Sequence, residues 1–248
     1  MDVKIVCPSR LRARDVLTTQ YIPDLIFIVR KEEVEEYSEW NPDQEVIGTP
    51  EDVNNIAKTR QWILENFSED NVFMVDDDVC SIRRTYAERG ERSDIYDVKL
   101  INDLIGEHAY ICKQIGAYMW GYQSIRNPNE YISHRPYRLT GYLNNSHVGF
   151  LKGHGLNYAL DYGEAEDYYI SLLNYYEHRY AFIDTRFTFI TKDNFLADGG
   201  VNDIRTVDMM KSNTIKLRKV FGEAVVLKKP TANKKRLHEG ERSLRFRL

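Results

Sequence analysis

Three consecutive aspartates, Asp76, Asp77 and Asp78, follow the apolar run 71–75. Along an extended chain, Asp76 and Asp78 would lie on one side and Asp77 on the other. Two carboxylates at a strand end can hold Mg²⁺ or Mn²⁺ when the cation also bridges substrate phosphates. A turn or a helix cap produces the same run of residues, so the triplet alone leaves both interpretations open.

The elements that must position the triplet are short apolar runs separated by polar or helix-like segments. We predict strands at Val3–Cys7, Leu25–Val29, Glu45–Ile47 and Val72–Val75, and a helix at Asn54–Phe67. Buried strands alternating with helix-length segments are typical of a parallel sheet covered by helices on both faces. Ligands bind such sheets at the carboxyl ends of the strands, so the residues that follow each run are the candidate binding residues.

The residues after the first predicted strand are rich in cations and hydrogen-bonding groups: Pro8, Ser9, Arg10 and Arg12. The arginines of this segment recur at a spacing of two, which does not place them on one helical face. A binding loop is therefore one interpretation, and an ordinary first helix decorated with arginines is the other.

The triplet stands where GT-A glycosyltransferases carry their DxD motif, and the region resembles those enzymes. The resemblance implies an α/β fold of the GT-A type, with a Rossmann-like, mixed but mostly parallel sheet flanked by helices. It implies that Asp76 and Asp78 hold Mn²⁺ or Mg²⁺ on the diphosphate of a donor, expected to be a UDP-sugar. It also implies that Asp76, Asp77 and the loop from Pro8 to Arg12 contact the nucleotide sugar.

Two further segments fit this resemblance. The segment Asn54–Asn66 resembles the helix before the DxD strand, which carries an arginine toward the diphosphate, and Lys58 and Arg60 are the cations here. Their alternative is the solvent face of an amphipathic helix. Gly153 and His154 precede a second motif, and the resemblance assigns both of them to the donor site.

The second motif is an acidic pair, Glu166 and Asp167, that opens a predicted helix. It resembles the acceptor-side motif of inverting GT-A enzymes, which implies that Asp167, or otherwise Glu166, is the catalytic base. A positioned carboxylate that removes the proton of an acceptor hydroxyl contributes roughly 10²–10⁴ in rate. Acidic residues also stabilise first helical turns without any catalytic role.

Tyrosines crowd the middle of the chain, since 13 of the 17 lie between Tyr110 and Tyr180. Sugars and bases stack on aromatic faces, so we expect the acceptor and part of the donor sugar there. A tyrosine-rich sheet face or a dimer contact would give the same composition. Trp120, Tyr122 and Tyr142 are the aromatic residues that follow strand-like or turn-like segments.

The basic charge is concentrated at the C-terminus. Residues 211–248 carry 12 Lys and Arg against 3 Glu, or +9, whereas the whole chain is at −4. Together with residues 198–205 and Phe221-Gly222, this segment resembles the glycosyltransferases associated with TET/JBP-type base hydroxylases, which include phage enzymes. The resemblance implies DNA with a hydroxymethylated pyrimidine as acceptor. His238 stands where some GT-A enzymes keep a metal-ligand histidine. For the basic segment 211–248, the alternative to a DNA contact surface is a solvated helix and tail.

The composition is that of an ordinary globular protein, with 42% hydrophobic and 29% charged residues. No apolar run approaches the 18 or so residues of a membrane helix, so we expect a cytoplasmic protein, in the host cytoplasm for a phage enzyme. Cys7, Cys80 and Cys112 are expected to be free thiols. We predict one domain over 1–248, comprising a nucleotide-sugar half (1–110), an acceptor half (111–210) and the basic segment 211–248.

The function predicted from these features is metal-dependent transfer of a sugar from a nucleotide sugar to a hydroxyl group, with DNA as partner. Three alternatives stay open: a glycosyltransferase with a glycan or small-molecule acceptor, a nucleotidyltransferase, and a non-enzymatic DNA-binding protein. The first loop contains no glycine, unlike the glycine-rich loop usual in nucleotidyltransferases. The sequence predicts no particular oligomeric state.

Overall fold

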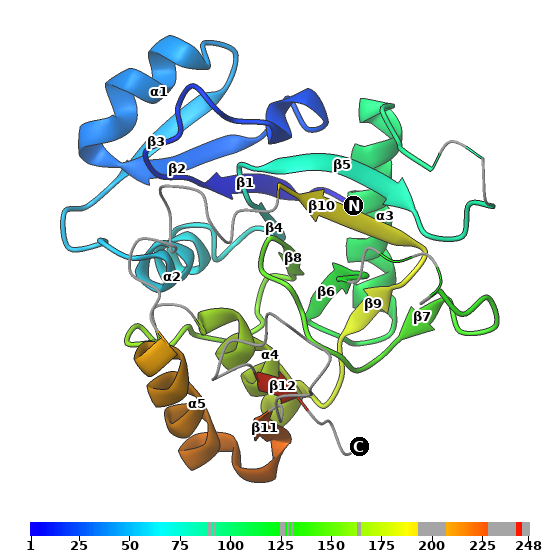
Figure 1. Cartoon of the computed structure of the whole chain (residues 1–248). Coiled ribbons are helices and arrows are strands. Elements are labelled where there is room, and N and C mark those ends of the chain that lie inside the picture. The colour runs from blue at the N-terminus through cyan, green and yellow to red at the C-terminus, as the bar shows by residue number, and fades with distance from the viewer. Residues whose placement is uncertain are drawn as a thin grey trace.

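The computed structural model describes residues 1–88, 91, 93–124, 127, 129, 131–162, 165–192, 207–227 and 242–244. At its centre lies an eight-stranded sheet of order β3-β2-β1-β4-β8-β6-β9-β7 (Figure 1). Four of its seven pairings are parallel, which confirms the predicted mixed, mostly parallel α/β class. The strands of this sheet are β1 (Lys4–Pro8), β2 (Ile26–Arg30), β3 (Glu45–Thr49), β4 (Val72–Val75), β6 (Met119–Tyr122), β7 (Tyr137–Arg138), β8 (His147–Phe150) and β9 (Phe182–Asp184).

Helices cover both faces of the sheet, as predicted. On one face, α1 (Val34–Trp40) and α3 (Val98–Gln114) pack in the cluster that contains Cys7 of β1. On the other face, α2 (Ile56–Asn66) and α4 (Glu166–His178) pack in the cluster that contains Val6 of β1. Adjacent residues of β1 thus enter opposite cores, as the twofold period of a strand requires.

Local sequence explains where two of these helices begin. The side chain of Asn55 accepts a hydrogen bond from the Lys58 backbone N–H at 2.9 Å and caps α2. The side chain of Asp97 caps α3 in the same way, accepting from Leu100 N at 3.0 Å. The structure confirms the predicted helix at 54–67 as α2 and the predicted strand at 72–75 as β4.

The segment between β1 and β2 departs from the helix-length pattern. Its only helical turn is a 3₁₀ turn at Thr18–Gln20. The backbone N–H groups of Leu17 and Thr18 donate to the Asp77 carbonyl at 2.9 and 3.2 Å. Because these donors bind the acidic triplet, they are not available for an α-helix, and the segment forms a loop over the strand ends.

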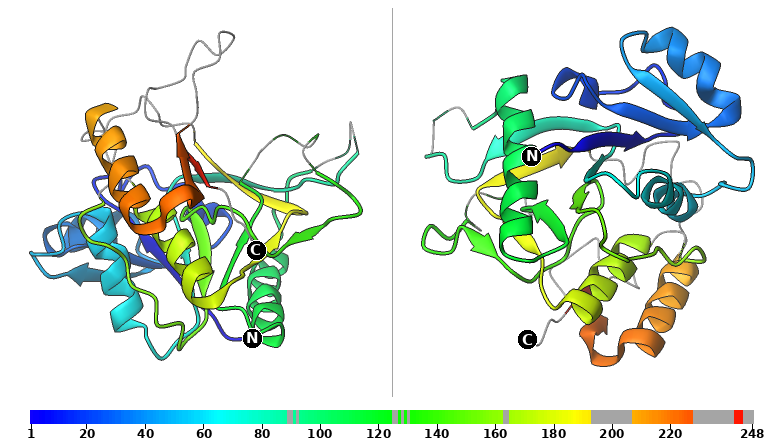
Figure 2. Two further views of the ribbon diagram at one scale, coloured as in Figure 1. Left: turned by 90° about the horizontal axis from the view of Figure 1, so that it is seen from below. Right: turned by 180° about the vertical axis from the view of Figure 1, so that it is seen from behind.

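Two smaller antiparallel pairs complete the described fold. In the first, β5 (Val79–Arg84) starts directly after the triplet and pairs with β10 (Phe187–Thr191). In the second, β11 (Val225–Leu227) pairs with β12 (Arg242–Leu244). Helix α5 (Val207–Phe221) lies beside α4 (Figure 2), with Leu217 and Leu172 in one apolar cluster. Among all the residues that the structure describes, no helix is long and apolar enough to cross a membrane.

Candidate active site

The acidic triplet occupies the turn between β4 and β5 instead of an extended strand end. The Asp76 N–H donates to the Ser146 carbonyl at 3.0 Å, which places the turn beside the segment that enters β8. The Asp78 carbonyl accepts from Lys192 N at 2.9 Å, at the end of β10. The strict alternation expected for the three side chains therefore does not apply, and each carboxylate has its own surroundings.

The Asp77 side chain is buried and bound to the first loop. Its carboxylate accepts hydrogen bonds from the Ser9 hydroxyl and from Arg12, whose Nη1 lies 3.0 Å from Oδ1. Arg12 Nη1 also lies 3.6 Å from Asp78. The structure thus brings Ser9 and Arg12 to the triplet, as the parallel pairing of β1 with β4 requires, and Asp77 ties the two strand ends together.

Two residues of the β2–α1 region that the sequence did not single out fix this loop. The Tyr37 hydroxyl accepts from Arg12 N at 3.1 Å and lies 2.6 Å from the Ser9 hydroxyl. The Glu33 carboxylate accepts from Leu11 N at 2.8 Å. Pro8 ends β1, and the half-buried Arg10 has a buried Nε with no hydrogen-bond partner among the described residues. No local pattern marks Tyr37 as a site residue, since it also fills the core.

Arg60 links the two sequence motifs. Its side chain is 4% exposed, with Nη2 at 2.9 Å from Asp76 Oδ1 and Nε at 3.9 Å from Glu166 Oε1. Burial would lower the pKa of Arg60, but Asp76 and Glu166 raise it, so the guanidinium stays charged. A charged group from α2 therefore lies between the triplet and the first turn of α4.

The carboxylates around Arg60 hold their protons more tightly than free ones. Burial, reinforced by Asp78 and Asp77 and opposed by Arg60, raises the pKa of Asp76 to about 7. About a third of the Asp76 side chain, 31%, still reaches solvent. Burial and the neighbouring Asp167 raise the pKa of Glu166 well above that of a free glutamate. Burial is the largest cause of both shifts, and a cation bound beside these groups would lower both pKa values by favouring the charged carboxylates.

Asp167 is half-buried and lies beside Glu166 in the first turn of α4. Its Oδ1 accepts from Tyr168 N at 2.7 Å, and its Oδ2 accepts from the hydroxyl of Tyr142. The carboxylate is more accessible than that of Glu166, whose side chain is 8% exposed. Access for a substrate is thus better at Asp167.

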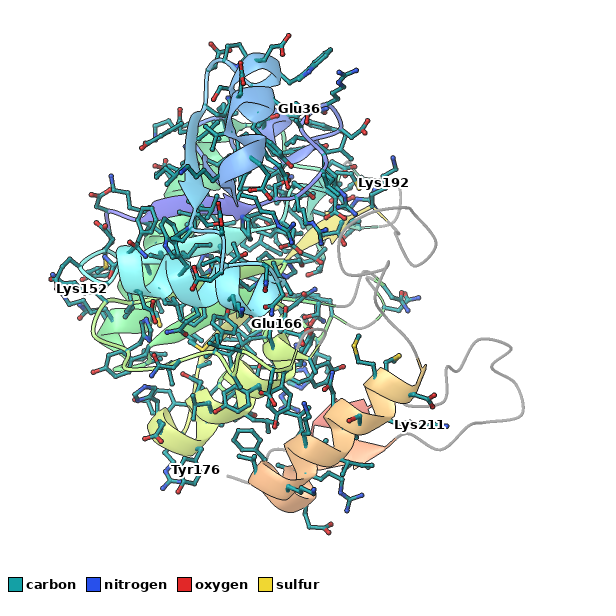
Figure 3. The ribbon with its side chains drawn as sticks, turned by 90° about the vertical axis from the view of Figure 1, so that its left-hand side faces the viewer. Glu36, Lys152, Glu166, Tyr176, Lys192 and Lys211 are labelled. Carbon is teal, nitrogen blue, oxygen red and sulfur yellow. The ribbon has the colours of Figure 1, made fainter. Side chains whose placement is uncertain are left out.

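Gly153 and His154 lie away from this cluster. Strand β8 runs antiparallel to β4, so the residues that follow β8 lie where β4 begins, at the opposite end from the triplet. The His154 carbonyl accepts from His178, the last residue of α4, whereas Glu166 is the first residue of that helix. Figure 3 shows Lys152 and Glu166 toward opposite ends of α2. The structure does not bring Gly153 and His154 to the donor side, because the antiparallel return carries them away from it.

Other candidates also lie outside the cluster. Lys58 turns back to the loop before α2, where its Nζ donates to the Asp52 carbonyl at 2.8 Å. Trp120 and Tyr122 are core residues with exposures of 0% and 1%. The indole of Trp120 covers Gly149 so closely that a Cβ there would lie 2.0 Å from it, which explains the glycine in β8. His238, residues 198–205 and the lysines of 228–235 lie outside the described residues.

The donor set suits a hard divalent cation that is shared with a substrate. Among the described residues, no group of three or more His, Cys, Asp or Glu side chains is arranged to hold a metal ion without help. Asp76 and Asp78 supply carboxylate oxygens, and Mg²⁺ sites of this kind take their remaining ligands from phosphates and water. The two carboxylates therefore fit a metal that arrives with a diphosphate.

Comparisons with known proteins show the family of this chain. The model of a family described as TET-Associated Glycosyltransferase matches residues 3–200. The Beta-glucosyl-HMC-alpha-glucosyl-transferase of Enterobacteria phage T2 is 28% identical over 113 residues, which cover 44% of this chain and 39% of that relative.

Solved structures resemble the chain more distantly. S. aureus TarS 1-349 is 9% identical with a TM-score of 0.45, over 88% of this chain and 66% of that one. A197 from STIV is 13% identical with a TM-score of 0.40, over 77% of this chain and 86% of that one.

Proposed function

Since this chain belongs to the TET-associated glycosyltransferase family and is a glycosyltransferase, we propose that it is a metal-dependent, inverting enzyme. Its donor is a UDP-sugar, and its acceptor is a hydroxymethylated pyrimidine base in DNA. Family membership favours this function over nucleotidyl transfer and over DNA binding without catalysis.

The observation that carries the proposal is the position of Arg60 between Asp76 and Glu166, at 2.9 and 3.9 Å. Donor-side and acceptor-side motifs that lie 90 residues apart in sequence (166 − 76) meet at one buried cation. A glycosyltransferase needs this proximity, because the anomeric carbon must lie within bonding reach of the acceptor hydroxyl while the diphosphate is still bound.

On the donor side, Asp76 and Asp78 would hold Mg²⁺ or Mn²⁺ against the diphosphate. When bound, the metal would supply Lewis-acid stabilisation of the leaving diphosphate. Arg60 and Arg12 contribute positive charge beside these carboxylates, and Ser9 and Arg10 line the adjoining loop.

On the acceptor side, Asp167 removes the proton of the acceptor hydroxyl as its oxygen bonds to the anomeric carbon. The bond from that carbon to the diphosphate oxygen breaks on the opposite face, so configuration inverts. Glu166 is buried, and its Oε1 lies 3.9 Å from Arg60 Nε, which suits a role in holding Arg60 better than a role at the substrate.

Support for a DNA acceptor comes from the family and from the phage relative, whose name gives beta-glucosyl-HMC as the group that it glucosylates. A base inside a duplex is inaccessible to a carboxylate at a helix N-terminus, so the base must turn out of the stack to reach Asp167. The excess of basic residues in 211–248 provides charge for the DNA backbone.

The test is an incubation of the protein with Mn²⁺, a panel of nucleotide sugars, and oligonucleotides that carry normal or hydroxymethylated pyrimidines. Release of nucleoside diphosphate together with a hexose or pentose mass gain on the modified base supports the proposal. Asp78→Asn removes a proposed metal ligand and should abolish transfer. Its matched control is Asp103→Asn, at an exposed position of α3 that pairs only with Lys99 in the described structure. Transfer to glycans or small molecules with none to DNA would refute the nucleic-acid acceptor.

A further inference from the structure

Residues 141–143, in the segment that leads to β8, pack on one face of α4. Asp167, Ser171 and Tyr175 recur every four residues along α4, so their side chains form a single stripe. The Tyr175 hydroxyl accepts from Gly141 N at 3.0 Å and donates to Gly141 O at 2.8 Å. The Ser171 hydroxyl accepts from Leu143 N at 3.2 Å. The backbone on both sides of Tyr142 is therefore fixed to α4.

The Tyr142 hydroxyl takes no part in these hydrogen bonds. It contacts the carboxylate of Asp167, which the proposed function assigns as the catalytic base. It donates to Oδ2 of Asp167, while Tyr168 N donates to Oδ1 at 2.7 Å. These two donors fix the orientation of the carboxylate from both sides. Both carboxylate oxygens of Asp167 act as hydrogen-bond acceptors, which is the role that a base for a substrate hydroxyl requires.

The ring of Tyr142 also faces another aromatic ring at the same place. Its centroid lies 4.7 Å from that of Tyr168, with 31° between the planes. Both side chains are half-buried, in contrast to the core rings of Trp120 and Tyr122. The carboxylate of Asp167 thus contacts one of two stacked, half-buried tyrosines, and aromatic side chains of this kind are surfaces on which nucleobases stack irrespective of their sequence.

We propose that Tyr142 and Tyr168 form the acceptor subsite. Tyr142 is a positioning residue that orients Asp167, and a planar pyrimidine stacks on the Tyr168 ring, which itself packs against the Tyr142 ring, with its hydroxymethyl group toward Asp167. The proposal rests on the proposed function, because it needs sugar transfer to a base. It predicts that the protein distinguishes planar aromatic acceptors from aliphatic alcohols.

The experiment measures kcat and KM for an oligonucleotide that carries one hydroxymethylated pyrimidine, with the sugar donor that the wild type accepts. Tyr168→Leu removes the ring and should raise the acceptor KM by about 5-fold to 150-fold, the range expected for losing one base-stacking contact. Tyr168→Phe keeps the ring and should restore a KM close to that of the wild type. Tyr142→Phe should lower kcat by about 10-fold or more with little change in KM, because it loses only a hydrogen bond to a charged group.

Tyr176→Leu is the matched control, since Tyr176 lies at the other end of α4 (Figure 3) and is 68% exposed. Unfolding midpoints near that of the wild type would establish that each variant folds. If the wild type modifies DNA but Tyr168→Leu keeps its KM, or Tyr142→Phe lowers KM or changes nothing, the inference is wrong and the proposed function stands. If the wild type modifies no hydroxymethylated pyrimidine, both are wrong.

Discussion

Replacing Arg60 with methionine tests whether this buried cation holds the donor and acceptor sides together. Methionine keeps an unbranched side chain of similar length, so the variant removes the charge with limited loss of packing. Lys58→Met is the control on the same helix, because the Lys58 ammonium donates to the Asp52 carbonyl and the Asn54 side chain, at 2.8 and 3.1 Å, in the loop before α2.

The expected magnitude follows from burial around Arg60. Removing one partner of a buried charge pair costs about 3–5 kcal/mol of stability. Asp76 is 31% exposed and Glu166 is 8% exposed, so water can solvate the first carboxylate but hardly the second. Protonation of the carboxylates also limits the cost, and we therefore expect the lower end of the range, about 3 kcal/mol at pH 8.

The loss should depend on pH with a defined sign. Arg60 lowers the pKa of Asp76, which is about 7 with the arginine present, so its removal raises that pKa further. A raised pKa means that the folded variant binds a proton that the unfolded chain, with a pKa near 4, does not. The stability of the variant is then highest at low pH and falls as pH rises, so its deficit is small at pH 6 and largest above pH 8.

Urea unfolding followed by tryptophan fluorescence, with the buried Trp120 as a reporter, would measure these values at pH 6, 7 and 8. Sugar transfer by the variant should also fall by about 10² or more, whereas Lys58→Met should resemble the wild type in both assays. A deficit under about 1 kcal/mol at pH 8, or one that grows as the pH falls, would refute the ion-pair reasoning.

Four other perturbations test the metal, the catalytic base, the basic segment and a buried histidine. Asp78→Asn or excess chelator should abolish transfer with an unchanged melting temperature, and activity that persists with chelator would exclude the metal. Asp167→Asn should lower kcat by about 10² while donor binding is retained in calorimetry; near-normal turnover would shift the base to Glu166. Neutralising four lysines of the basic segment, Lys228, Lys229, Lys234 and Lys235, should flatten the salt dependence of DNA binding, because log K changes with log[salt] by about −0.9 per phosphate contact. An unchanged slope would show that this segment does not contact the DNA. Burial lowers the pKa of His147 from the usual 6.5 to about 3, so stability should fall as the pH drops below 6.5. His147→Gln should reduce that fall in acid unfolding curves, and an unchanged fall would show that another group causes it.

Local sequence was sufficient for the elements that position the donor side. The strand at 72–75 was predicted with its observed bounds, because an apolar run between polar segments specifies a central buried strand. The helix at 54–67 was predicted to within two residues at each end, since its amphipathic pattern is visible in the sequence. The meeting of Ser9 and Arg12 with the triplet followed from parallel strand ends.

The sequence by itself thus determined the α/β class, the position of the triplet and the acidic start of α4, because each depends on residues close together in the chain. Only the tertiary structure decided that Arg60 contacts both motifs, that Tyr142 contacts Asp167, and that His154 lies at the far end of the sheet. These outcomes depend on the direction in which β8 returns beside β4 and on how α4 packs against it. Hydrophobic periodicity records which side of a strand is buried, but it contains no information on the strand's neighbour or on its direction, and those two choices place the acceptor side next to the donor side.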